Sequence, residues 1–131
     1  MPVRHSNPDT IHAPAGYSHI AEVSGGRLVY TSGQVALDRD GNLVGAGDLE
    51  AQARQVFENL NAALAAAGTD FNSVVKLNYF FAGDVDISVV REVRNEYVNT
   101  ASPPASTAVV VNRLVRPEWL LEVEAIAVVP D

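Results

Sequence analysis

The sequence predicts an α+β domain in which two helices cover one face of a mixed β-sheet. Three observations lead to this fold class: two segments with helical periodicity, strand-like segments on either side of each, and the resulting order β-β-α-β-α-β-β. The chain has 131 residues, which suits one compact domain and is short for two. We therefore expect a single domain over residues 1–131, with an extended N-terminal segment at residues 1–16.

The first two strands are predicted on either side of a glycine pair. Polar and apolar residues alternate over residues 19–24, Gly25 and Gly26 follow, and RLVYTSGQV at residues 27–35 is again strand-like. Two short strands joined by a glycine turn are typical of a β-hairpin. The next segment, LDRDGNLVGAGD, contains Asp40-Gly41, which predicts a second tight turn.

Residues 49–67 form the clearest helical pattern. Asp48 is a good N-cap and Gly68 a good C-terminal stop. Phe57 widens the apolar stripe enough that the helix needs a sheet to cover it. The other apolar side chains of the stripe recur every three or four residues: Leu49, Ala53, Val56, Leu60, Ala63, Leu64 and Ala67.

A third strand and a second helix follow. SVVKLNYFFAG at residues 73–83 alternates, so one face should be buried and should carry Val75, Leu77, Tyr79 and Phe81. Asp84 or Asp86 should cap a helix that runs to about Asn99 and is stopped before Pro103 and Pro104. The inner side of this helix is predicted from its apolar spacing: Ile87, Val90, Val93 and Tyr97.

Two final strands are expected at residues 106–114 and 120–129, with a turn around Pro117 between them. In the last strand, two glutamates fall on the same face as two aliphatic residues. The face of the sheet that the helices leave uncovered would then present apolar side chains, which favours self-association. These predicted positions are Phe80, Val110, Ile126 and Val128, beside Glu122 and Glu124.

Composition and charge exclude several classes of function. The chain has no cysteine, which rules out thiol catalysis and cysteine metal sites. Its net charge of −7, without a cluster of Lys or Arg, argues against nucleic acid as a partner. No apolar run reaches the roughly 18 residues of a membrane span, and the polar N-terminus has no signal-peptide core, so we expect a cytoplasmic protein without a membrane partner. His5, His12 and His19 lack other ligands at a suitable spacing, so we expect no metal site.

Three segments in this order resemble the RidA (YjgF, or L-PSP) family, and together they cover residues 10–129. They are GYSHIAEV with VYTSGQVALD, AQARQVFENLNAALAAAG with SVVK, and NRL with LEVEAIAVV. The resemblance implies a chorismate-mutase-like fold, a homotrimer, and small-metabolite sites in the clefts between subunits. It also implies hydrolysis of reactive enamines and imines to ketones and ammonia, with no metal or organic cofactor.

The resemblance also implies site residues. Tyr17 matches the family's tyrosine, although Gly16 replaces the usual proline before it. Ser32 matches the serine of the TSGQ motif, and Glu122 matches the glutamate thought to position or activate the attacking water. Three positions depart from the family: the carboxylate-clamping arginine is Ser106, an asparagine that lines the cleft is Arg91, and a nearby aromatic position is Arg94.

The chemistry of these residues leaves alternatives open. A carboxylate near the electrophilic carbon is sufficient as a general base, and Glu122 fits, with Glu124 as an alternative. Serine at position 106 cannot reproduce a bidentate arginine clamp, so either the substrate lacks a carboxylate or Arg91 or Arg94 supplies the charge. We therefore weigh a deaminase with altered substrate choice against a non-catalytic binding module. Ribonuclease or translation inhibition is disfavoured by the negative charge.

Overall fold

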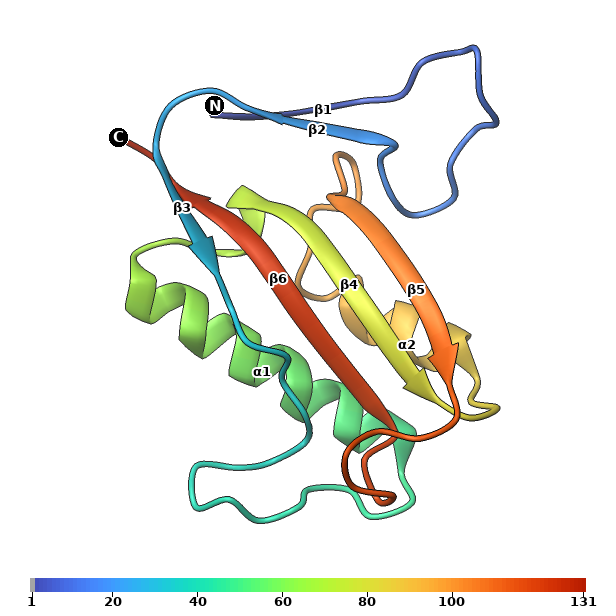
Figure 1. Ribbon diagram of the computed structural model, residues 1–131. Coiled ribbons are helices and arrows are strands. Elements are labelled where there is room, and N and C mark those ends of the chain that lie inside the picture. Colours follow the sequence, from blue (N-terminus) through green and yellow to red (C-terminus); the bar gives the residue numbers. More distant parts are fainter. Residues whose placement is uncertain (1) are drawn as a thin grey trace.

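The computed structural model describes residues 2–131 and confirms the predicted fold class (Figure 1). Both helices lie behind one face of a four-stranded mixed sheet with the order β3-β6-β4-β5. The β4 and β5 strands are parallel and are connected through α2, whereas β6 is antiparallel to both of its neighbours. The elements of this layer are β3 (Arg27–Tyr30), α1 (Leu49–Ala67), β4 (Val74–Ala82), α2 (Ile87–Arg94), β5 (Ala105–Val111) and β6 (Leu121–Val129), with a 3₁₀ turn at Phe71–Ser73.

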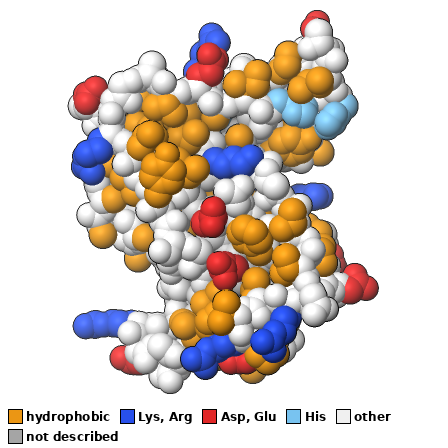
Figure 2. Space-filling view, viewed as in Figure 1, with side chains coloured by type: hydrophobic (Ala, Val, Ile, Leu, Met, Phe, Trp, Pro, Cys, Tyr) orange, Lys and Arg blue, Asp and Glu red, His pale blue; other side chains and the backbone are white. Residues whose placement is uncertain are grey.

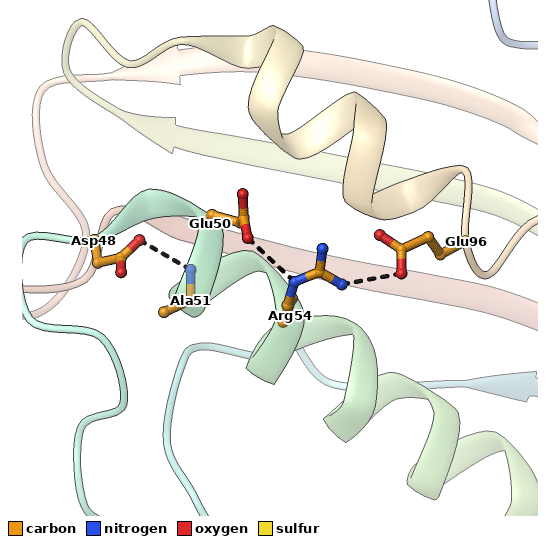
Figure 3. Close-up of polar contacts among 5 residues, drawn as sticks. All are labelled: Asp48, Glu50, Ala51, Arg54 and Glu96. Atoms are coloured by element: carbon orange, nitrogen blue, oxygen red, sulfur yellow. Dashed lines mark hydrogen bonds and ion pairs between the residues drawn. The ribbon is translucent and has the colours of Figure 1, made fainter.

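The first helix, α1, has the bounds that the sequence predicts. The Asp48 side chain accepts a hydrogen bond from the Ala51 amide at 3.1 Å, and Gly68 ends the helix with φ +90°. Arg54 bridges Glu50 at 3.4 Å and Glu96 at 3.0 Å, which links α1 to the turn after α2 (Figure 3). These ion pairs are exposed and contribute little stability, so the cap and the apolar face determine the helix.

The core lies between α1 and the sheet. Phe57, Leu60 and Leu64 of α1 are fully buried against the sheet side chains. At the start of α1 the buried Gln52 amide donates to the carbonyls of Gly45 and Glu118, and its oxygen accepts from the Leu120 amide. These bonds satisfy groups that would otherwise be buried unpaired. They tie the loop before α1 to the loop before β6.

The predicted hairpin around Gly25 and Gly26 is wrong. The turn exists, with φ +79° and +81°, but β2 (Ile20–Val23) pairs with β1 (Val3–Ser6) in a separate two-stranded sheet. The β3 strand pairs instead with β6 and ends at Tyr30 rather than near residue 35. The extended N-terminal segment at residues 1–16 therefore contains a strand. Alternation reports which face of a strand is buried and does not report which strand pairs with it.

The buried face of β4 begins one residue earlier than predicted. The register against β6 shifts between Val74 and Lys76, so Val75 is the extra residue of a β-bulge and Val74 is buried in its place. From Leu77 onward the predicted alternation holds, and Tyr79 faces the helices. The bulge therefore changes which residue is buried at the start of β4 and leaves the orientation of Tyr79 and Phe81 as predicted.

The second helix is shorter than predicted. It is capped by Asp86, whose carboxylate accepts from the Ser88 amide at 3.1 Å, and it ends at Arg94 rather than near Asn99. Tyr97 lies beyond its end, stacks on Phe57 with ring centroids 5.3 Å apart, and donates a hydrogen bond to Glu58 at 2.7 Å. The chain therefore leaves the helix after Arg94, and Tyr97 contacts α1 instead of extending α2.

The uncovered face of the sheet is apolar in part, as predicted, but two of its residues differ. Val128 is fully buried against Gly26, and Val110 lies on the helix side because it pairs with Phe81. Figure 2 views the face of the sheet opposite the helices, where apolar patches surround acidic and basic side chains. The most exposed apolar side chains of this face are Leu28 (50 %), Tyr30 (68 %) and Val109 (41 %). No helix among residues 2–131 has both the length and the apolarity to cross a membrane.

Candidate active site

A cavity of about 220 Å³ lies on the helix side of the sheet, between α2 and β5. Its sheet wall is formed by Tyr79 and Phe81 of β4 and by Ser106 and Ala108 of β5. Its helix wall is formed by α2. Four of the six site residues inferred from the sequence line this one cavity: Tyr17, Arg91, Arg94 and Ser106. Residues that are up to 89 positions apart in the chain, from Tyr17 to Ser106, are therefore brought together.

Backbone pairing with the start of β5 places Tyr17 at the cavity. The buried Ser18 bridges Ala105, its amide donates to the Pro104 carbonyl at 3.1 Å, and its hydroxyl donates to the Pro103 carbonyl at 2.6 Å. This segment therefore runs beside β5 as a short parallel extension of the sheet. Tyr17 is held at the mouth of the cavity by the residue that follows it.

The loop histidines contribute to the position of Tyr17, a role that the sequence did not reveal. His12 Nε2 lies 3.0 Å from the Tyr17 hydroxyl, and His19 Nε2 lies 2.7 Å from the His12 carbonyl oxygen. The rings of His12 and Tyr17 both meet the His19 ring edge-to-face. A loop has no periodic pattern from which such a contact is predictable. Among residues 2–131, no group of three or more His, Cys, Asp or Glu side chains is arranged to hold a metal ion.

The guanidinium of Arg94 is fixed within the site. Its Nε and Nη2 donate to Asn95 Oδ1 at 3.2 and 2.9 Å. Gly16 lies directly against it, since a Cβ at position 16 would be 2.8 Å from Arg94 Nη2. Two departures from the family pattern, glycine at 16 and arginine at 94, are therefore in contact. Arg91 lies one turn earlier on the same side of α2 and is exposed.

Tyr79 is a site residue that the sequence analysis placed in the core. Its side chain is 5 % exposed and its residue lines the cavity, while its hydroxyl is buried and has no hydrogen-bond partner within residues 2–131. Burial raises the pKa of the Tyr79 hydroxyl above its usual range, and the nearby Arg94 charge acts in the opposite direction. The hydroxyl therefore remains protonated at neutral pH.

Glu122 and Ser32 lie on the opposite face of the sheet. Glu122 alternates with the buried Leu121 and Val123, so its side chain points away from the helices. Its carboxylate lies over Gly33, where a Cβ would overlap Oε2. Ser32, the preceding residue, is exposed beside this contact. The TSGQ segment therefore contains a glycine where the carboxylate approaches the backbone most closely.

The two candidate bases of β6 differ in their contacts. Asn78 Nδ2 donates to Glu124 Oε2 at 3.2 Å, so this carboxylate is held across the sheet. The ion pairs within residues 2–131 involve Arg4 with Glu22, and Arg54 with Glu50 and Glu96, so none of them neutralises Glu122. Glu122 is therefore the β6 carboxylate that remains available to accept a proton.

The six residues thus form two half-sites on opposite faces of one chain. The first half-site consists of the cavity residues Tyr17, Arg91, Arg94 and Ser106, and the second consists of Ser32 and Glu122. A substrate in the cavity is separated from Glu122 of the same chain by the sheet. Within one chain, the six residues therefore do not form one continuous site.

Gly33→Ala should lower the activity that depends on Glu122 by about tenfold. The new Cβ would displace the Glu122 carboxylate, and misplacement of a catalytic group by an ångström is costly. The backbone at Gly33 does not have a positive φ, so alanine should fold normally. Steady-state rates and a thermal melt of the variant provide the measurement.

The control is the same substitution in a Glu122→Gln background. If Gly33→Ala acts through the carboxylate, it should have no further effect there. An equal loss in both backgrounds would indicate instead that Gly33 acts on the fold.

Comparisons with known proteins show which families and chains this sequence and fold resemble. The family model described as Endoribonuclease L-PSP matches residues 8–129. A mouse protein named 2-iminobutanoate/2-iminopropanoate deaminase is 42 % identical over 123 residues, which cover 91 % of this chain and 87 % of the mouse protein. Protein DfrA of Myxococcus xanthus is 41 % identical over 112 residues, or 86 % and 84 % of the two chains. A crystal structure of YyfB from Yersinia pestis, a Rid-family protein described as of unknown function, superposes with a TM-score of 0.85 at 34 % identity and covers 98 % of this chain and 99 % of that one.

Proposed function

Because the chain belongs to the Endoribonuclease L-PSP family, the RidA family of the sequence resemblance, we propose that it is a hydrolase that deaminates a reactive enamine or imine. The unpaired Glu122 carboxylate over Gly33 is the observation that carries this proposal. The mouse relative, at 42 % identity, is named for deamination of two small 2-imino acids. We place the reaction in the cytoplasm, without a metal or organic cofactor.

The proposed reaction needs one base and one water. Glu122 accepts a proton from water while the water oxygen bonds to the imine carbon and the imine nitrogen is protonated. The C–N bond of the resulting carbinolamine then breaks as the hydroxyl proton is transferred, through Glu122 or water, to the leaving nitrogen, so that ammonia and a carbonyl are formed. An enamine enters the same sequence after it tautomerises to the imine. We propose that the Tyr17 hydroxyl, 3.0 Å from His12 Nε2, contacts the substrate in the cavity.

We place this reaction in clefts between the subunits of a homotrimer. The cavity half-site and the Glu122 half-site face away from each other in one chain, and a ring of copies with head-to-tail contacts brings unlike faces together. The exposed apolar side chains on the sheet face support association through that face, since such patches mark interfaces.

Mixed trimers provide the test of this placement. Glu122→Gln and Tyr17→Ala should each be inactive alone, whereas trimers assembled from both chains should regain activity. When equal amounts of the two variants assemble at random, roughly a quarter of the clefts take Tyr17 from a Glu122→Gln chain and Glu122 from a Tyr17→Ala chain. Activity after co-refolding is the readout, and light scattering should give the trimer mass. A monomeric mass, or inactive mixtures of well-folded trimers, would contradict the shared cleft.

Substrate choice is proposed to differ from that of the relatives because Ser106 occupies the position of the family's arginine. Serine offers one neutral hydrogen bond in place of a bidentate, charged pair. The positive charge of the cavity comes from Arg91 and Arg94 on the α2 wall instead. A carboxylate would therefore be bound at a different place relative to the reacting carbon.

The second candidate function is a binding module without turnover. The loss of arginine at position 106 favours it, and a bound ligand without hydrolysis would be its signature. Ribonuclease activity, which the family description names, is disfavoured by the net charge of −7, because phosphate backbones are repelled by such a surface.

A further inference from the structure

The charge of the cavity is not compensated by the protein. Arg91 and Arg94 are three residues apart on α2 and both line the cavity. Arg94 also borders an adjoining cavity of about 240 Å³, together with Gly16 and Asn95. No Asp or Glu side chain is among the residues that line either cavity. Two cations without a lining carboxylate favour an anionic ligand.

The Arg94 guanidinium is oriented before any ligand binds. Asn95 accepts two of its five N–H groups, and the remaining groups are unpaired with side chains of residues 2–131. Gly16 permits this position, because any other side chain would begin 2.8 Å from Nη2. A guanidinium that is already fixed loses little entropy when it binds a planar anion.

Tyr79 lines the same cavity, and its hydroxyl is the buried polar group beside the two arginines. It is buried without a partner, and a buried hydroxyl in that state carries an energetic cost that a ligand acceptor would remove. Ser106 adds a smaller donor on the adjacent strand. The cavity therefore combines fixed positive charge with an unsatisfied neutral donor, and both are complementary to an oxygen anion.

We propose that Arg94, with Arg91 and the Tyr79 hydroxyl, binds the carboxylate of the substrate, so that the clamp lies on the α2 wall rather than on β5. Carboxylate fits better than other anions, because its two coplanar oxygens match a guanidinium fork and leave lone pairs for the tyrosine. That this carboxylate belongs to the substrate rests on the proposed function. It makes the substrate a carboxylate-bearing imine or enamine whose carboxylate faces α2, where Arg94 binds it and Gly16 leaves room for the Arg94 guanidinium.

Calorimetric titration with 2-oxobutanoate tests the clamp without turnover, because this ketone retains the carboxylate of the corresponding imine. Arg94→Met should raise its Kd by about tenfold or more. Arg27→Met is the matched control, since it removes the same charge from β3, outside the cavity, and should leave Kd unchanged. The neutral 2-oxobutanamide should bind weakly to all variants and show no dependence on Arg94.

Two further variants separate ligand binding from folding. Tyr79→Phe should weaken 2-oxobutanoate binding severalfold while Tm stays equal or rises, because the hydroxyl makes no hydrogen bond in the folded chain. A structural role for the hydroxyl would lower Tm instead. Gly16→Ala should also weaken 2-oxobutanoate binding, because its Cβ would displace the Arg94 guanidinium, but the φ of +80° at this position means that its Tm should fall as well. In the double variant with Arg94→Met it should cause no further loss of binding.

Equal Kd values for Arg94→Met and Arg27→Met would overturn the proposal. Tighter binding of inorganic phosphate than of 2-oxobutanoate would overturn the assignment of a carboxylate. Failure of the proposed function would look different from failure of the clamp. A chain that binds 2-oxobutanoate through Arg94 but hydrolyses no imine would have the clamp and would be a binding module rather than an enzyme.

Discussion

Glu122→Gln should reduce imine hydrolysis by about 10²- to 10⁴-fold, the usual contribution of a general base, and should leave the fold intact. The amide has the size of the carboxylate but cannot accept the proton of the attacking water. The side chain has no ion pair within residues 2–131, so its replacement breaks none. The loss should therefore appear in kcat, with little change in Tm. The imine is generated in situ by a dehydratase, and ketone release is followed.

Glu124→Gln is the matched control for this prediction. It lies two residues along the same face of β6, but its carboxylate already accepts a hydrogen bond from Asn78. We expect a small effect on kcat. If the two variants lose activity equally, the base is not specific to Glu122. The same preparations should leave single-stranded RNA intact, and cleavage that disappears in Glu122→Gln would contradict the electrostatic argument against RNA.

Ser106→Arg should raise the rate on 2-iminobutanoate or 2-aminoacrylate by about ten- to a few-hundredfold. A charged hydrogen bond to a carboxylate contributes roughly 1.5–3 kcal/mol, and a bidentate pair also fixes the pose of the substrate. Each 1.36 kcal/mol corresponds to about a tenfold change in rate when the clamp acts in the transition state. Ser106 lines the cavity, so the new guanidinium would enter it from the β5 wall.

Ser106→Gln controls for bulk, because it lengthens the side chain without adding charge and should give no gain. Glu122→Gln in the Ser106→Arg background should abolish the gain if both groups act on one reaction. The proposed α2 clamp binds the carboxylate, whereas the predicted gain assumes that this clamp alone does not place the reacting carbon well for hydrolysis. An unmodified protein that is already fast on these imines and is crippled by Arg91→Ala would contradict that assumption. Unchanged turnover in every Ser106 and Glu122 variant would leave the binding module as the function.

Local patterns were sufficient for α1 and for most strand faces. The α1 helix has its predicted cap and stop because Asp48 and Gly68 act within one turn of the chain. Alternation in β4 and β6 correctly placed Tyr79 toward the helices and Glu122 away from them. Such features depend on residues a few positions apart, and the sequence displays them directly.

Pairing over long distances was not predictable from those patterns. Alternation is the same whether β2 pairs with β3 or with β1, so the predicted hairpin was wrong. The bulge at Val75 and the early end of α2 at Arg94 likewise accompany contacts with β6 and α1. These choices are made by packing between distant segments.

The sequence by itself determined the fold class and the family, and through the resemblance it named six candidate site residues. Only the tertiary structure decided that these residues divide between two faces, that Gly16 makes room for Arg94, and that Tyr79, with its buried unpaired hydroxyl, lines the cavity. The physical reason is the range of the interactions. Periodicity and capping act over a few residues, whereas a cavity is the space left between side chains that are brought together by the complete set of sheet pairings and helix contacts.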